Sequence, residues 1–246
     1  MFESPAIFYL LLFLIAFLYA SVGHGGASGY LALMALYSIS PEVMKPTALM
    51  LNLFVSVVAF IQFYRGGFFR KDLFWPLAIC SIPFAFVGGL LSIDASVYKF
   101  ILGILLVITV IRFLFFSNFK NTELRKPDKI AAGAIGGAIG FLSGLIGIGG
   151  GIILSPILLL LRWSDMKQTA AISALFIFVN SLSGLMGQLY TGITFSADMF
   201  TYVLVAFGGG LAGAYVGSLR LKAVALKNVL ALVLIVAAWK LLFTNA

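Results

Sequence analysis

The 246-residue sequence predicts an all-α polytopic membrane protein made of two inverted-topology repeats. Hydrophobic residues make up 62% of the chain and charged residues 10%, against about 25% charged residues in soluble domains. Apolar segments long enough to cross a bilayer core of ~30 Å recur along the chain. Runs of glycine interrupt this sequence at 23–26 and at 147–151, in corresponding places of two halves. This composition excludes a soluble enzyme.

The first half, residues 1–117, is predicted to hold one helical hairpin and three transmembrane helices. The hairpin joins an apolar arm at 6–22 to a shorter arm at 28–38. At ~1.5 Å per residue, the second arm is too short to cross a membrane as a helix. The glycine run between the arms forms the tip. The transmembrane helices are predicted at 47–64, 74–93 and 98–117.

A hydrophilic linker at 118–129 separates this half from a second half, residues 130–246, which repeats the pattern. Its predicted elements are a hairpin with arms at 130–145 and 152–161, and transmembrane helices at 169–190, 200–219 and 229–243.

Individual residues also repeat between the halves. Gly23, Gly25 and Gly26 align with Gly147, Gly149 and Gly150. The segment MKPTA at 44–48 aligns with MKQTA at 166–170. The aligned threonines, Thr47 and Thr169, each open a predicted helix, so we predict that they are its N-caps.

The basic loops predict how the chain lies in the membrane. Loops rich in Lys and Arg are placed in the cytoplasm, and they are found at 65–71, 118–129, 162–167 and 220–227. Both termini then lie outside, together with the loops at 40–45, 94–96 and 191–198. Each half crosses the membrane an odd number of times, so the second half is inverted. The two hairpins therefore enter from opposite sides, and their tips are expected to meet near the midplane.

The two glycine tips are predicted to bind a small anion. A short helix begins at each tip, and a helix N-terminus exposes unpaired N–H groups and carries roughly half a positive charge. Glycine allows a ligand to approach these N–H groups closely. We expect an oxyanion held mostly by the backbone between two opposed helix N-termini. The predicted binding glycines are Gly23, Gly25, Gly26, Gly147, Gly149, Gly150 and Gly151.

Two further glycine runs, at 133–144 and 208–217, are better explained by helix packing. Small residues spaced along a membrane helix allow two backbones to approach closely. We predict that these runs mark helix–helix contacts rather than a ligand site.

Four polar side chains complete the predicted substrate site. His24 is the only histidine and lies in the first tip, and an ionisable residue inside a membrane indicates function. It is expected to contact the substrate or to sense protons. Asn52 lies one helical turn before Ser56, and Asn180 and Gln188 share a face of the 169–190 helix. Such polar stripes either line a pathway or bond to a neighbouring helix, and we favour a pathway.

Catalytic chemistry is not expected. The predicted spans hold no Asp or Glu, and the single cysteine, Cys80, is distant from His24 in the sequence. A metal cluster or a nucleophile–base pair needs more such side chains. We predict no catalytic residue, no metal site and no cofactor. The alternative, an intramembrane enzyme, would have to pair Ser21 or Ser28 with His24.

The segment GLIGIGGGIILSP, at 144–156, resembles the TauE/SafE family of sulfite exporters, also called the toluene-sulfonate uptake permease family. That family carries a duplicated GxGGG motif followed by proline. The matching residues of the second copy are Gly147, Gly149, Gly150, Gly151 and Pro156. The first copy departs, because Ala27 replaces the third clustered glycine and Ala32 stands where proline is expected. The resemblance implies movement of sulfite or an organosulfonate, such as sulfoacetate, across a bacterial cytoplasmic membrane.

Two functions fit these observations. The first is a secondary transporter that moves a small sulfur-containing anion by alternating access. The second is a passive small-anion channel, which uses the same helix ends but opens to both sides at once. The expected partners are the anion and the lipid bilayer. Nucleic acid is not expected, because the basic residues form no continuous stripe with interleaved aromatics. The 24 phenylalanines suit either lipid or a homodimer interface.

Overall fold

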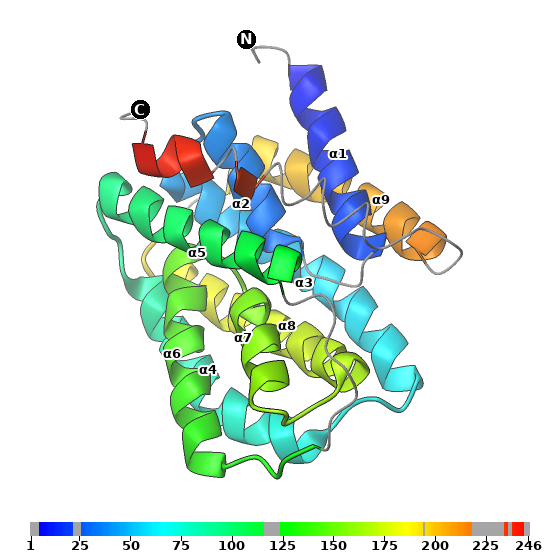
Figure 1. Ribbon diagram of the computed structural model, residues 1–246. Helices are drawn as coiled ribbons and strands as arrows, with labels where there is room; N and C mark the ends of the chain where they lie inside the picture. Colours follow the sequence, from blue (N-terminus) through cyan, green and yellow to red (C-terminus); the bar gives the residue numbers. More distant parts are fainter. Residues whose placement is uncertain are drawn as a thin grey trace.

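The computed structural model describes residues 5–21, 26–115, 124–193, 195–217, 234–235 and 238–243. These residues contain helices and no strand, which confirms the predicted all-α class (Figure 1). The labelled helices are α1 (Pro5–Ser21), α2 (Ala27–Leu36), α3 (Pro41–Arg65), α4 (Lys71–Leu90), α5 (Ala95–Phe115), α6 (Lys129–Ile146), α7 (Gly151–Leu160), α8 (Met166–Tyr190) and α9 (Ala197–Gly217).

The helix lengths agree with the predicted hairpins. Among the described helices, α3, α4, α6 and α8 are long and apolar enough to cross a membrane. By contrast, α2 and α7 have 10 residues each, too few for a ~30 Å core. Each short helix follows a longer arm, α1 or α6, after a glycine-rich break. The first half of the linker, residues 118–123, lies outside the described residues, and α6 begins at the last residue of the linker.

The predicted N-cap role of Thr47 is wrong. Helix α3 begins at Pro41, six residues earlier than predicted, because proline fits a first turn whose N–H groups have no helical acceptor. Thr47 therefore lies inside the helix, where its Oγ1 donates to the carbonyl oxygen of Val43 at 2.6 Å.

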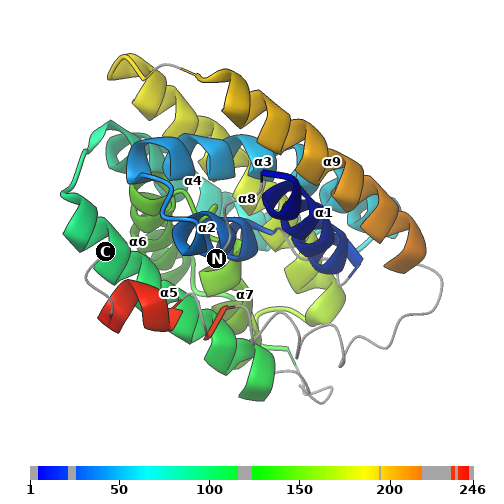
Figure 2. The ribbon, with the colours of Figure 1, turned by 90° about the horizontal axis from the view of Figure 1, so that it is seen from above.

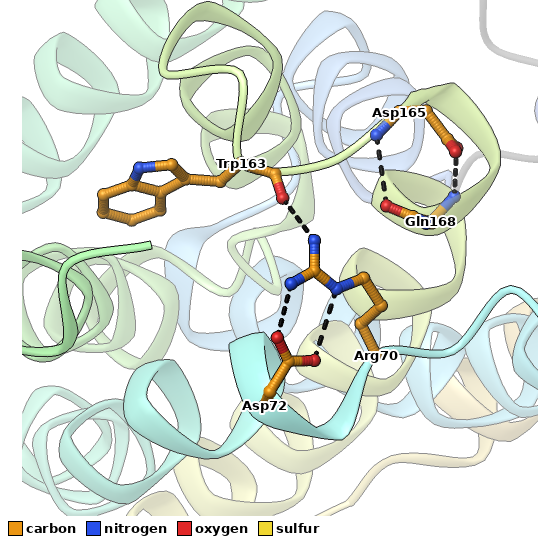
Figure 3. A network of polar contacts seen from close by, with 5 residues as sticks. All are labelled: Arg70, Asp72, Trp163, Asp165 and Gln168. Carbon is orange, nitrogen blue, oxygen red and sulfur yellow. Dashed lines mark hydrogen bonds and ion pairs between the residues drawn. The ribbon is translucent and has the colours of Figure 1, made fainter. Parts of the chain in front are cut away.

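The predicted N-cap role of Thr169 is also wrong. Helix α8 begins at Met166, and its N-cap is Asp165, whose carboxylate accepts from the N–H groups of Lys167 and Gln168. The Gln168 side chain accepts from the Asp165 N–H in return, which completes a capping box (Figure 3). Asp is a stronger N-cap than Thr, so the helix starts at the aspartate.

Glycines allow close packing in two helix pairs, α4 with α6 and α1 with α9. Gly136, Gly140 and Gly144 of α6 lie so close to α4 that an added Cβ would overlap a backbone carbonyl oxygen there. Gly209 and Gly213 of α9 lie equally close to the backbone of α1. Figures 1 and 2 show both helix pairs side by side. The predicted packing role of these two glycine runs is confirmed.

Replacing Gly144 with alanine should destabilise the protein severely. The new Cβ would overlap the carbonyl oxygen of Ala85, and a helix backbone cannot move aside as a flexible side chain can. Overpacking of this kind typically costs about 1–3 kcal/mol or more. Gly137→Ala is the matched control, because its Cβ would stand 3.4 Å from the Phe84 ring, in ordinary contact. Melting temperatures in detergent would test this, and equal values for the two variants would contradict the packing assignment.

The loops collect at two ends of the molecule. At one end, which we call the cavity end, Pro41, Leu91 and Thr191 line a common cavity, and Lys240 Nζ donates to Leu36 O at 2.7 Å. The opposite end contains the loop after α3, the segment before α6 and the loop after α7. These three segments lie at the lower edge of Figure 1. The described loops thus group as the charge pattern predicted.

The opposite end, which we call the arginine end, is held by contacts between its loops. The Arg70 guanidinium donates to the backbone oxygen of Trp163 at 2.9 Å and pairs with Asp72 (Figure 3). The Arg125 N–H donates to the backbone oxygen of Arg162 at 2.7 Å. These bonds tie the loop after α7 both to the start of α4 and to the segment before α6.

Candidate functional site

The first glycine tip is described only at its last residue. Gly23, His24 and Gly25 lie outside the described residues, so their predicted roles stay predictions. Gly26 is the N-cap of α2, and the Tyr30 ring folds back against it. Tyr30 is fully buried, and its hydroxyl has no hydrogen-bond partner among the described residues.

The second glycine tip is described completely. Gly147, Gly149 and Gly150 have φ angles of +88°, +74° and +77°, which only glycine adopts without strain. These angles end α6 and start α7 within a few residues. The N–H groups of Ile153 and Leu154 donate to Gly150 O. Within the described chain, the N–H groups from residue 149 to 152 have no backbone acceptor, so they are available to a ligand.

Asn52 of α3 lies directly against this tip. A Cβ built on Gly149 would stand 2.6 Å from Asn52 Nδ2, so the amide and the glycine are in close contact. Asn52 is 0% exposed, and neither Nδ2 nor Oδ1 has a hydrogen-bond partner in the described part of the chain. A buried amide without partners is costly, which makes this an arrangement that a polar ligand would complete. Asn52 therefore lies beside the tip, and its predicted role in lining a substrate pathway stays a prediction.

The two polar residues of α8 are placed differently from each other. Asn180 is fully buried, and its Nδ2 donates to Phe176 O at 2.8 Å, while Oδ1 has no partner among the described residues. Gln188 instead lines the cavity at the cavity end. The structure thus brings Asn52 to the glycine tip and Gln188 to a separate cavity.

Several buried hydroxyl groups were not included among the predicted site residues. Tyr30, Ser143 and Ser181 are buried, and their hydroxyls have no partner among the described residues; Ser56 shares this property. A signal existed for two of them, because Tyr30 follows Gly26 by one helical turn and Ser181 is next to Asn180. Hydroxyls are common in membrane helices, so this signal is weak.

Other bonds hold the second tip in place. Tyr98 of α5 donates its hydroxyl to the backbone oxygen of Ile146, the last residue of α6, at 2.8 Å. Ser155 donates to Gly151 O at 2.7 Å and lies 3.0 Å from the Ser173 hydroxyl of α8. The tip is therefore anchored from α5 and from α8.

Comparison with known proteins supports a transport role. Residues 8–241 match the family model described as Sulfite exporter TauE/SafE. The chain is 37% identical to the probable membrane transporter protein y4hK of Sinorhizobium fredii, over 94% of this chain and 95% of that protein. It is 34% identical to the probable membrane transporter protein MJ0441 of Methanocaldococcus jannaschii, over 48% of this chain and 47% of that protein. No solved structure matches the chain.

Proposed function

The chain belongs to the TauE/SafE family of membrane transporters, and we propose that it is a secondary transporter of a small sulfur-containing anion, either sulfite or an organosulfonate such as sulfoacetate. One observation carries the proposal: the partnerless amide of Asn52 lies against Gly149, in a tip whose N–H groups from residue 149 to 152 have no backbone acceptor within the described chain. Amide N–H groups and a helix N-terminus together favour an oxyanion. The bacterial cytoplasmic membrane is the proposed location.

The directions of the two short helices support a central anion site. Helix α2 runs from the first tip to the cavity end, where Lys240 contacts its last residue. Helix α7 runs from the second tip to the arginine end, where Trp163 follows it. Their N-termini therefore point inward from opposite directions. Ile148 of the second tip belongs to the same extended apolar cluster as Ala27 and Tyr30 of α2. The other tip residues, Gly23, His24 and Gly25, are proposed to complete the site.

Helix contacts support the proposed inverted repeats. Exchanging the two halves pairs α1 with α6, α3 with α8, and α4 with α9. Helix α4 packs on α6 and α8, and its counterpart α9 packs on α1 and α3, while α3 and α8 pack on each other. This pattern maps onto itself when the halves are exchanged. The charge of the loops favours the arginine end as cytoplasmic, with both termini outside.

An alternating-access carrier agrees better with the two ends than a channel does. The cavity end is hollow, and its rim residues Leu91, Ser92 and Thr191 are exposed. The arginine end is tied by the Arg70–Trp163 bond (Figure 3). A carrier is open on one side while the other is closed, whereas a conducting channel is open on both.

Breaking the arginine-end contact should therefore close the cavity end in a carrier. We expect Arg70→Ala to slow the labelling of Leu145→Cys, a cavity residue, by a membrane-impermeant maleimide in a Cys80→Ala background. A several-fold slowing is expected, because one hydrogen bond to a charged group contributes about 1.5–3 kcal/mol. Asp72→Asn is the control, since the Arg70–Trp163 bond stays and an exposed ion pair contributes little. Unchanged labelling in Arg70→Ala would favour the channel.

The direct test of the function is uptake into proteoliposomes. Purified protein should transport labelled sulfite or sulfoacetate, and the same anions should raise its melting temperature, because a ligand that binds the folded state stabilises it. Acetate and taurine serve as comparison solutes. Neither uptake nor a thermal shift with any sulfur oxyanion would overturn the proposed substrate class.

A further inference from the structure

The cavity at the cavity end has a volume of about 290 Å³. Its walls come from α3, α4, α5, α6 and α8, and from the segments that follow α4 and α8. Apolar side chains, among them Leu90, Leu145 and Ile193, form much of the lining. The volume is close to the lower limit of small-molecule pockets, which is roughly 300 Å³. It exceeds what a single inorganic oxyanion would fill.

Two polar residues of the cavity lining suit an anion. Gln188 is 2% exposed, and neither its Nε2 nor its Oε1 has a hydrogen-bond partner among the described residues. Lys45 brings an ammonium group to the same lining. Its Nζ lies 3.1 Å from Leu91 O and 3.4 Å from the backbone oxygens of Gly88 and Gly89. Two of these three bonds are long, so these carbonyl oxygens hold the ammonium weakly.

Lys45 also connects the cavity to the second glycine tip. A Cβ built on Gly147 would stand 2.9 Å from Lys45 O and 3.4 Å from Lys45 Cγ. The backbone and stem of Lys45 therefore lie against the tip, while its ammonium lines the cavity. An anion bound at Lys45 would be separated from the tip by one side chain.

We propose that this cavity is a capture subsite for small organic anions, distinct from the site at the glycine tips. The acidic head is bound by the Lys45 ammonium and the Gln188 amide, and the hydrocarbon part contacts Leu90, Leu145 and Ile193. The exposed carboxylate of Glu42 also lines the cavity and opposes an anion there. This inference rests on the proposed transport function, because the subsite holds the anion before the anion is transported.

The alternative is that Lys45 only caps the C-terminal end of α4. A cation near helix-terminal carbonyls is stabilising, so this role would show as a loss of stability in a Lys45 variant. It would give no dependence of ligand binding on Lys45, Gln188 or Glu42. Ligand affinity, measured separately from stability, therefore distinguishes the two roles.

The experiment is calorimetric titration of the full-length protein in detergent with methanesulfonate, 1-propanesulfonate and propylammonium. Propanesulfonate should bind more tightly than methanesulfonate, by about fourfold per buried methylene. Lys45→Met should weaken propanesulfonate about tenfold or more, and Gln188→Leu by about fivefold. Glu42→Gln should strengthen it about twofold, because a like charge is removed. Propylammonium should not compete.

Control variants keep the test decisive. Lys45→Arg retains the positive charge and should retain binding, and Glu42→Gln changes only an exposed side chain, so both keep the proposal testable if Lys45→Met does not fold. Propanesulfonate affinity that is indifferent to Lys45, Gln188 and Glu42 would overturn the subsite. Charge-dependent binding without any uptake into proteoliposomes would instead contradict the transporter proposal and leave the subsite standing.

Discussion

Replacing Asn52 with leucine should raise the melting temperature of the protein and abolish transport. Both amide atoms of Asn52 are buried without partners among the described residues, and a partnerless buried polar group costs about 1–3 kcal/mol. Leucine has nearly the same branched shape and no polar atom, so it removes this cost without leaving a cavity. The same change removes the amide that faces the second glycine tip, so the anion loses a bonding partner.

Asn52→Leu is informative because its melting temperature is expected to rise while its transport activity falls. Melting temperature in detergent and sulfite uptake in proteoliposomes would be measured on the same preparation, and uptake should fall by about tenfold or more. Asn180→Leu is the matched comparison. Its Nδ2 already donates to Phe176 O, so the gain in stability should be smaller. A lower melting temperature for Asn52→Leu would mean that its amide has a structural partner and would remove the main support for the site.

Hydropathy and glycine content were sufficient to predict the all-α class and the positions of several long helices. An apolar run of more than about 17 residues must cross a bilayer or be buried, which is why α4, α6 and α8 lie within a few residues of their predicted places. The break between α6 and α7 followed from the cost of glycine in a helix. The start of α3 did not follow, because residues 40–45 were predicted to form a loop, although a proline such as Pro41 fits the first turn of a helix.

The site was only partly predictable for a physical reason. Helical spacing shows which residues share a face, but it does not show how deep each one lies. Gln188 follows Asn180 by eight residues, or about 12 Å along the axis, which moves it from the packed middle of α8 to the cavity at its end. The contact between Asn52 and Gly149 depends on how α3 crosses the hairpin, and this crossing involves residues nearly 100 positions apart.

Gly149→Ala should abolish transport through two separate effects at the second tip. Its φ of +74° would cost an alanine about 1–2 kcal/mol. The new Cβ would also stand 2.6 Å from Asn52 Nδ2 and 2.9 Å from Ile177 Cγ2, so the tip or the amide would have to shift. We expect uptake below about 5% of wild type, because an alignment error of ~1 Å at a binding site can cost about a hundredfold.

A control separates the backbone strain from the overlap of the new Cβ with its neighbours. Gly67, in the loop after α3, has a φ of +75°, and an added Cβ there would meet nothing within 4 Å. Gly67→Ala therefore carries the same backbone strain as Gly149→Ala but no contact with the site. If only backbone strain mattered, Gly67→Ala and Gly149→Ala would lose similar amounts of stability. The uptake of each variant would then be proportional to its amount of folded protein. Loss of uptake in Gly149→Ala alone, at matched amounts of folded protein, would place the anion at the second tip, whereas normal uptake in both would remove the tip from the transport path.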